Sequence, residues 1–232
     1  EKIAMKMKSE NVNIEHVQIS KSSPSGVATI TKSPEDNSII VIPGANSLVD
    51  PEDIQKRESL ISESDILLSQ LEIPLQTVNA AMKLAKKNGV LTVLNPAPYQ
   101  TMDDEFLSYV DFITPNETEF LSMFSNMHTD THVSLEEAML VWQSKHKTRL
   151  IVTLGSNGCA YVENESVIKI PAYQVKVVDT TGAGDTFNGA LAHCLAQSKD
   201  LNHSLRFAVK AGSLSVEQFG AQSGMPTLDQ LQ

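Results

Sequence analysis

The sequence predicts an α/β fold with a central, mostly parallel β-sheet flanked by helices and with a small β flap. From residue 50 onward, short apolar segments rich in β-branched residues alternate with helical patterns, which is the order that βαβ units produce. A glycine-rich turn at residues 182–184 stands between residues 175–178, a β-branched stretch that predicts a strand, and a helical stretch, as at phosphate-binding helix N-termini. Residues 25–42 depart from the alternation and predict the flap.

The flap is predicted from two β-branched stretches, residues 25–31 and 38–42. Pro, Asp and Asn in the connecting residues 32–37 favour a hairpin loop. We expect the pair to form a small sheet of its own. Two edge strands of the main sheet are the alternative.

The α/β part begins with a helix start at residue 50. Asp50 is an N-cap signal and Pro51 suits the first helical position, which predicts a helix to about residue 62. Ser134 and Glu137 form a capping box, and Gly89 is a helix stop. The other expected strands are residues 65–69, 90–94, 112–114 and 150–154, with a hairpin at 158–163 and 167–170, and the other expected helices are residues 75–88, 134–147, 187–197 and 201–218.

Length and composition fit a single domain over residues 1–232, with 41% hydrophobic residues. The formal net charge of −10 argues against a nucleic-acid partner, which requires clustered Lys and Arg. No apolar run approaches the ~20 residues that span a bilayer, so we expect no membrane partner. Cys159 and Cys194 lack metal-site spacing, and we expect buried, reduced thiols in a cytoplasmic protein, with a disulfide as the alternative.

Residues 178–190 carry the strongest chemical signal. Gly182 and Gly184 would let the backbone approach an anion without a Cβ clash, and the following helix start offers unpaired N–H groups. A carboxylate is a poor phosphate ligand, so we expect Asp185 to accept a proton from a hydroxyl that attacks the phosphate. The alternative is a strand-to-helix turn in which Asp185 is only an N-terminal cap.

Five polar or glycine positions follow expected strands: Glu72, Asn95, Asn116, Gly155 and Asp179. In open α/β sheets, ligands bind at the carboxyl ends of the strands. This shared placement predicts one ligand site at that edge of the sheet.

Residues 179–187, Asp-Thr-Thr-Gly-Ala-Gly-Asp-Thr-Phe, resemble the C-terminal signature of the ribokinase-like carbohydrate kinases. The resemblance implies the ribokinase-like fold. It also implies a catalytic turn in which Gly182, Ala183, Gly184 and the amide of Asp185 form the anion hole for the transferred phosphoryl group. Asp185 would then be the general base that contacts the sugar hydroxyl.

Two further segments resemble the nucleotide site of this family. Residues 113–119 are similar to its Asn-x-x-Glu segment, which implies that Asn116 approaches the ATP phosphates and Glu119 organises Mg²⁺ through its waters. A simple N-cap with a capping-box glutamate is the alternative. Residues 152–158 resemble the strand and turn along ATP. The implied nucleotide-binding residues are Asn116, Thr153, Gly155, Ser156, Gly158, Gly184 and, beside adenine, Val209.

The resemblance also implies a site for a monovalent cation, usually K⁺ in this family. Carbonyl-rich turns with one carboxylate suit a large, weakly hydrated ion. A structural turn without an ion is the alternative. The matching residues are Asp179, Thr181, Ser215, Gln218, Gly220 and Gly224.

The sugar specificity is suggested by residues 68–74 and 94–98, which resemble the ribose-phosphorylating members of the family. Glu72 would bind a ribose hydroxyl. The implied activity is ATP-dependent phosphorylation of D-ribose at its 5-hydroxyl, in a homodimer formed through residues 25–42, the lid over the sugar. Kinases for deoxyribose, fructose or a nucleoside are the alternatives.

Two segments of the family pattern are not found: a strand with a sugar-binding Asp, and a Gly-Gly-Lys-x-x-Asn segment. Residues 1–13 resemble the helix that follows them. We therefore expect the N-terminal quarter of the pattern to be missing from this chain. A nucleotide-binding fragment without turnover is the second functional hypothesis.

Overall fold

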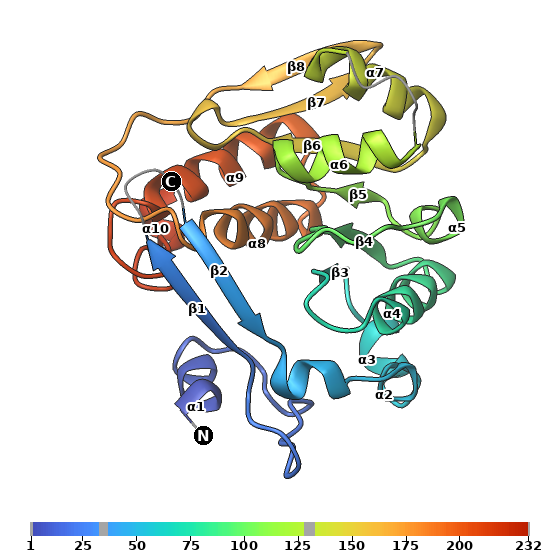
Figure 1. The fold of residues 1–232 in the computed structure, drawn as a ribbon, viewed down its shortest axis with the longest axis vertical. Coiled ribbons are helices and arrows are strands. Elements are labelled where there is room, and N and C mark those ends of the chain that lie inside the picture. The colour runs from blue at the N-terminus through green and yellow to red at the C-terminus, as the bar shows by residue number, and fades with distance from the viewer. Residues whose placement is uncertain (1, 33–36, 128–132, 232) are drawn as a thin grey trace. The chain divides into compact units, whose positions relative to one another are not determined.

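The computed structural model of the chain describes residues 2–32, 37–127 and 133–231. They form two compact units, Glu1–Val49 and Asp50–Gln232. Each unit has a sheet of its own, with two strands in the first unit and six in the second (Figure 1).

The first unit contains the hairpin expected at residues 25–42. Its strands β1 (Val27–Lys32) and β2 (Asn37–Ile42) pair antiparallel in continuous register. Helix α1 (Lys2–Ser9) precedes the hairpin, and the 3-10 helix η1 (Gly44–Leu48) follows it. Both predicted strands are therefore confirmed, whereas the turn at residues 33–36 lies outside the described residues.

The six strands of the second unit follow the chain in the order β3-β4-β5-β6-β7-β8. Strands β3 to β6 are parallel to one another, and β7 and β8 add an antiparallel hairpin at one edge. The turn residues Asn164 and Glu165 have positive φ angles of 48° and 59°, as a two-residue hairpin turn requires. The strands are β3 (Ile66–Ser69), β4 (Leu91–Leu94), β5 (Phe112–Ile113), β6 (Arg149–Thr153), β7 (Cys159–Glu163) and β8 (Ser166–Ile170).

Helices connect the strands of this sheet and follow its two faces (Figure 1). They are α2 (Pro51–Gln55), α3 (Glu58–Ser62), α4 (Leu75–Lys87), α5 (Asp104–Leu107), α6 (Glu117–Met127), α7 (Leu135–Lys145), α8 (Ala183–Ala196), α9 (Leu201–Ser215) and α10 (Leu228–Leu231), with the 3-10 helix η2 (Gly155–Asn157) after β6.

Two separate cores bury the two faces of the six-stranded sheet. Successive side chains of a strand point to opposite faces. Leu94 and Ile113 accordingly pack with side chains of α4, α6 and α7, whereas their neighbours Val93 and Phe112 pack with side chains of α8 and α9. A parallel sheet needs helices on both faces, and the predicted α/β class is confirmed.

The structure differs from the sequence predictions at residues 50–62 and at residues 175–178. The helix expected at residues 50–62 is split, because Arg57 leaves the helical conformation (φ −118°, ψ 26°) between α2 and α3. Residues 175–178 form no strand within the described sheets. The N–H groups of Val178 and Asp179 instead donate to the Val216 carbonyl at 2.8 and 3.1 Å, so the loop after α9, and not a sheet edge, takes up these groups.

The predicted free cysteines are confirmed: Cys159 and Cys194 are both unpaired and buried. Burial raises the pKa of the Cys159 thiol to about 12, so this thiol stays protonated and unreactive at neutral pH. Among the described helices, none combines the length and the apolar character that crossing a membrane would need.

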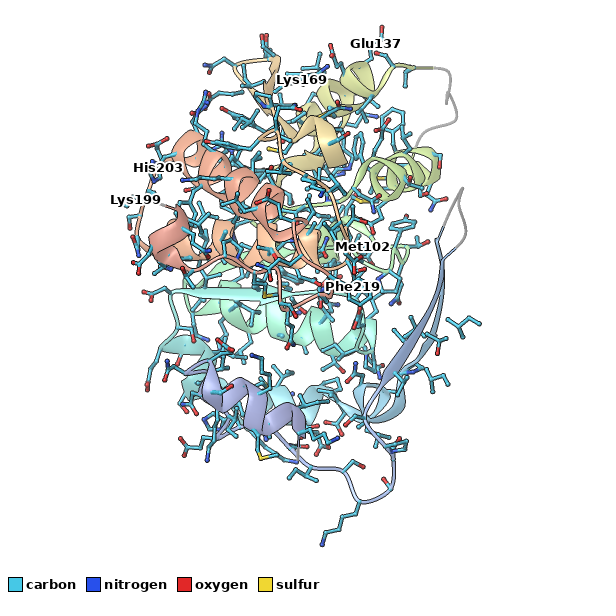
Figure 2. The ribbon with its side chains drawn as sticks, turned by 90° about the vertical axis from the view of Figure 1, so that its left-hand side faces the viewer. Met102, Glu137, Lys169, Lys199, His203 and Phe219 are labelled. Atoms are coloured by element: carbon cyan, nitrogen blue, oxygen red, sulfur yellow. The ribbon has the colours of Figure 1, made fainter. Side chains whose placement is uncertain are left out.

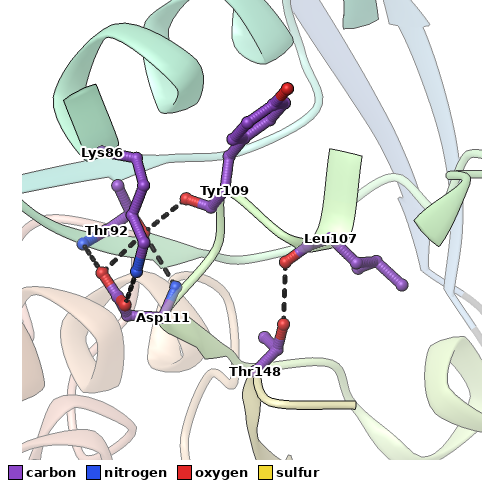
Figure 3. Close-up of polar contacts among 6 residues, drawn as sticks. All are labelled: Lys86, Thr92, Leu107, Tyr109, Asp111 and Thr148. Atoms are coloured by element: carbon purple, nitrogen blue, oxygen red, sulfur yellow. Dashed lines mark hydrogen bonds and ion pairs between the residues drawn. The ribbon is translucent and has the colours of Figure 1, made fainter. Parts of the chain in front are cut away.

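A polar cluster joins α4, the amino end of β4 and the residues before β5 (Figure 3). Thr92 is fully buried, and its Oγ1 donates to the Tyr109 carbonyl and accepts from the Asp111 N–H, both at 2.8 Å. The Asp111 carboxylate accepts from the Thr92 N–H at 3.0 Å and from the Lys86 ammonium. One threonine hydroxyl therefore satisfies two partly buried backbone groups.

We expect Thr92→Val to lower the free energy of unfolding by about 1–3 kcal/mol, because it leaves those two backbone groups without a partner. Urea titration at pH 7 measures the change. Thr118→Val, at an exposed position of α6, is the matched control and should stay within about 0.5 kcal/mol of the parent. Equal effects at both positions would contradict the assignment.

Candidate active site

The anion-binding turn predicted at residues 182–184 is the N-terminus of α8. The helix begins at Ala183 rather than at residue 187, because Gly182 adopts a left-handed conformation (φ 82°) as its N-cap. The first N–H groups of a helix have no acceptor within it, which leaves those of Gly184 and Asp185 to bind a ligand. A Cβ placed on Gly184 would meet no atom within 4 Å, so there is room for an anion beside these donors.

Asp185 lies in the first turn of α8, next to this anion-binding turn. Its Oδ1 accepts a hydrogen bond from Nε2 of Gln70 at 2.7 Å. Burial raises the pKa of the Asp185 carboxyl, and the Gln70 hydrogen bond offsets part of that increase. The N-cap of α8 is Gly182, without a side-chain hydrogen bond, so Asp185 is not the helix cap. A carboxylate of raised pKa is the stronger proton acceptor.

Asn116 and Glu119 form a reciprocal cap at the start of α6. The Asn116 Oδ1 accepts from the Glu119 N–H, and the Glu119 Oε2 accepts from the Asn116 N–H, both at 2.8 Å. Burial raises the pKa of Glu119, and its bond to the Asn116 N–H offsets part of the increase. The predicted capping box is thus present. It uses Oε2 of Glu119, so Oε1 of the same carboxylate can accept a hydrogen bond from a water molecule bound to a cation.

Asn116 also lies beside Thr153, as expected for residues that share a nucleotide. The two residues form an isolated parallel bridge, and the Thr153 N–H donates to the Pro115 carbonyl at 2.9 Å. The turn that follows contains Gly155 and Gly158, with φ angles of 54° and 88°. A Cβ on Gly158 would lie 2.0 Å from the Ile170 carbonyl oxygen, so only glycine fits this close approach.

A buried polar chain connects the anion-binding turn to the end of β5. The Thr114 Oγ1 donates to the Asn188 Oδ1 at 2.6 Å, and the Asn188 Nδ2 donates to the Gly184 carbonyl at 2.9 Å. Asn95 donates to the Thr114 carbonyl at 3.0 Å. Thr114 and Asn188 are 1% and 4% exposed. Sequence reasoning missed this chain; the available signal was Asn188, a poor helix former one turn after Gly184.

Two of the predicted cation-binding residues, Thr181 and Gly220, bond to the carboxylate of Asp179, which is 6% exposed. Its Oδ1 accepts from the Thr181 hydroxyl at 2.8 Å, and its Oδ2 accepts from the Gly220 N–H at 3.0 Å. Gly224 packs against Ser215 so closely that a Cβ would lie 1.9 Å from the Ser215 carbonyl oxygen.

The same loop continues to the surface at two residues. Gln218 is exposed. Phe219 is 74% exposed (Figure 2). Gln218 is thus the exposed member of the predicted cation-binding set, whereas the others are buried or partly buried.

Two other predicted residues have different settings. Glu72 is exposed in the loop after β3, where its neighbour Leu71 donates from its N–H to the Ala97 carbonyl at 2.9 Å. This bond places residues 68–74 and 94–98 side by side. Val209 is 4% exposed and packs into the core with Leu191 of α8, so its place beside adenine stays a prediction.

The fold and this arrangement define a class of phosphotransferase. The family model described as pfkB family carbohydrate kinase matches residues 1–228. The chain belongs to the pfkB family of carbohydrate kinases, and the resemblance found in its motifs is confirmed.

Named relatives place the chain more closely within the family. The ribokinase of Lactococcus lactis is 45% identical over 206 residues, which cover 89% of this chain and 65% of that protein. The deoxyribokinase of Salmonella typhi is 35% identical over 226 residues, covering 97% and 74%. The structure of Arabidopsis thaliana ribokinase complexed with ribose and ATP is 32% identical with a TM-score of 0.81, over 95% of this chain and 72% of that one. The ribokinase-like fold is therefore confirmed, and the chain spans about two thirds of the length of the Lactococcus relative.

Proposed function

We propose that this chain carries the catalytic machinery for ATP-dependent phosphorylation of D-ribose at its 5-hydroxyl. The observation that carries the proposal is the placement of Asp185 in the first turn of α8, beside N–H groups that have no acceptor within the helix and can hold a phosphoryl group. A base and an anion site are thus adjacent. The named ribokinases at 45% and 32% identity support ribose as the acceptor.

In the proposed reaction, Asp185 accepts the proton of the sugar hydroxyl as that oxygen bonds to the γ-phosphorus of ATP. The bond from phosphorus to the bridging oxygen breaks, and ADP leaves with the electron pair. The turn of Gly182, Ala183 and Gly184, with the Asp185 amide, stabilises the charge on the transferred group. Glu72 lies in the loop after β3, and we assign it to a sugar hydroxyl.

The nucleotide is assigned to the residues at the ends of β5 and β6: Asn116, Thr153, Gly155, Ser156 and Gly158. Within the described residues no group of three or more His, Cys, Asp or Glu could hold a metal. This fits Mg²⁺ that is bound mainly by phosphate oxygens and water, with Glu119 orienting the waters. Mg²⁺ would neutralise the phosphate charge.

We expect Glu119→Gln to raise the Mg²⁺ concentration needed for half-maximal turnover by about 10- to 100-fold, as for other outer ligands of metal sites. Glutamine keeps the carbonyl oxygen of the capping box, so the fold should be retained. A Mg²⁺ titration of the initial rate measures the effect. Glu117→Gln, in the same helical turn and exposed, is the control. Equal Mg²⁺ dependence in both variants would remove Glu119 from the metal site.

We assign a K⁺ site to the loops around Asp179, with Thr181, Ser215, Gln218, Gly220 and Gly224 as the remaining candidates. One carboxylate beside carbonyl-rich turns is a donor set that suits a large monovalent cation. An ion there would fix the turn that leads into α8. Equal rates in K⁺ and in tetramethylammonium would exclude this role.

Two alternatives have specific support. The Salmonella deoxyribokinase matches 97% of this chain, so 2-deoxyribose is the competing acceptor. A nucleotide-binding chain without turnover is the other hypothesis, because the family's Gly-Gly-Lys-x-x-Asn segment is not found in this sequence.

The test is ADP release with Mg²⁺, K⁺ and, in turn, ribose, 2-deoxyribose, fructose and a nucleoside. We assay this chain alone and fused behind the N-terminal segment of the Lactococcus relative. The proposal is supported if ADP release depends on ribose and if kcat/KM is higher for ribose than for the other three acceptors. A preference for another acceptor moves the assignment to that substrate, and ATP binding without ADP release in both proteins supports the non-catalytic alternative.

We propose a cytoplasmic homodimer whose contact is the hairpin of residues 25–42. This hairpin exposes several large apolar side chains: Val27, Ile40, Val41 and Ile42 are 57%, 64%, 54% and 60% exposed. Paired hairpins would cover such a surface. Sedimentation equilibrium should show a dimer that Ile40→Lys weakens and Leu121→Lys, at an exposed position of α6, does not. A monomer at all concentrations would refute the assignment.

A further inference from the structure

We infer that Gln70 is the positioning residue of the catalytic base, and this inference rests on the proposed role of Asp185. Gln70 follows β3 directly, whereas Asp185 opens α8, 115 positions later in the chain. The Gln70 Nε2 donates to the Asp185 Oδ1 at 2.7 Å. Because an ionised carboxylate can only accept, the glutamine must present its N–H₂ group here, which fixes the orientation of its amide.

The hydrogen bond gives the two carboxylate oxygens of Asp185 different roles. With Oδ1 held by Gln70, the carboxylate cannot rotate freely, and Oδ2 is left to meet the hydroxyl. Holding a reacting group in one geometry removes an entropic part of the barrier. Gln70 therefore orients the base without touching the reacting atoms itself.

The backbone that carries Gln70 is itself fixed. The Leu71 N–H donates to the Ala97 carbonyl at 2.9 Å, and the Asn95 N–H donates to the Ser69 carbonyl at 2.9 Å, so backbone bonds hold the chain on both sides of Gln70. The Ser69 hydroxyl donates to the Gln70 carbonyl at 3.0 Å. A glutamine on a fixed loop can hold its partner, which one on a mobile loop could not.

Within the part of the chain that the structure describes, no charged side chain of β3 or α9 bonds to Asp185. Strand β3, which packs against α8, has no ionisable side chain. On α9, Arg206 donates to Asn202 at 2.8 Å and Lys210 to the Leu231 carbonyl at 2.8 Å. His203, the other ionisable side chain of α9, lies in the first turn of that helix. The amide of Gln70 thus provides the hydrogen bond without the strong pKa decrease that a cation would cause.

The same loop also carries Glu72, the proposed sugar ligand. The residue that recognises the sugar and the residue that aims the base therefore share one short segment. The same loop then determines both the binding of the sugar and the orientation of Asp185. This gives a reason for the hydrogen bond between Gln70 and Asp185, which nucleotide binding alone would not require.

The test uses Gln70→Leu and Gln70→Glu, with Gln100→Leu as the matched control. Leucine removes the donor at similar size, and glutamate keeps the shape but replaces the donor by a second carboxylate. Gln100→Leu removes a glutamine hydrogen bond to Leu71, but it leaves the two backbone bonds beside Gln70 in place and does not touch Asp185. Asp185 is titrated by ¹³C NMR, with its signal assigned from its absence in Asp185→Asn.

We expect the pKa of Asp185 to be higher in Gln70→Leu than in the parent and higher still in Gln70→Glu. In the active protein, kcat should fall by about 10- to 100-fold in Gln70→Leu while KM for ATP stays unchanged. Gln100→Leu should change neither quantity.

An unchanged Asp185 titration in both Gln70 variants would overturn the inference, as would an equal shift in Gln100→Leu. A raised KM for ribose with kcat intact would also overturn it, because Gln70 would then be a sugar ligand. The titration needs no turnover. If the parent itself releases no ADP, the proposed function fails while the titration still decides whether Gln70 holds Asp185.

Discussion

Replacement of Asp185 by Asn is expected to lower kcat by about 10²–10⁴-fold while ATP binding is retained. Asparagine has nearly the same shape but cannot accept the proton of the sugar hydroxyl. The helix N-terminus that binds the phosphates stays in place, since Gly182 caps α8 without help from this side chain. The loss should therefore appear in turnover and not in nucleotide affinity.

Initial rates of ADP release and isothermal titration with a non-hydrolysable ATP analogue measure the two quantities. Asp229→Asn is the matched control, because Asp229 is also an exposed aspartate in the first turn of a helix, α10. Turnover of Asp185→Asn close to that of the parent would disprove the assignment of the base.

The same variant should be at least as stable as the parent at pH 7. Burial raises the pKa of Asp185, so the folded state binds its proton more tightly than the unfolded state does. The stability from this group is then present below the unfolded pKa and is lost as the pH rises through the folded pKa. Asparagine has no such loss, and urea titrations at pH 4 and pH 7 should show a smaller pH dependence.

Gly182→Ala is expected to lower kcat by about 10²–10³-fold, comparable to the loss of an oxyanion donor. Gly182 has a φ angle of 82°, which an L side chain rarely adopts, and a Cβ there would lie 2.7 Å from the Ala221 carbonyl oxygen. The backbone must shift to relieve this contact, and the N–H groups that follow it would move away from the phosphoryl group.

Gly189→Ala is the control for this change on the same helix. A Cβ at Gly189 meets no atom within 4 Å, and alanine is the better helix former, so stability should rise by up to about 1 kcal/mol with turnover unchanged. Circular dichroism of both variants shows whether the fold is intact. A Gly182→Ala protein that is folded and fully active would contradict the anion-hole assignment.

The sequence predicted the local elements well wherever short-range chemistry determines them. Asp50 and Ser134 cap their helices as expected, with hydrogen bonds to Asp53 and Glu137. The hairpins and the alternation of strands and helices follow from periodicity and turn residues, which act over a few positions. Residues 175–178 show the limit: their β-branched side chains predicted a strand, but the Val178 N–H donates to the Val216 carbonyl instead.

The sequence by itself determined the family, the glycine turn and the candidate base, because these depend on contiguous residues. Only the tertiary structure decided which distant residues support them. Gln70 meets Asp185 across 115 positions, and Thr114 meets Asn188 across 74. Such contacts depend on the positions of β3 and β5 in one sheet and on the packing of α8 against that sheet. The spacing of residues along the chain does not show this packing directly.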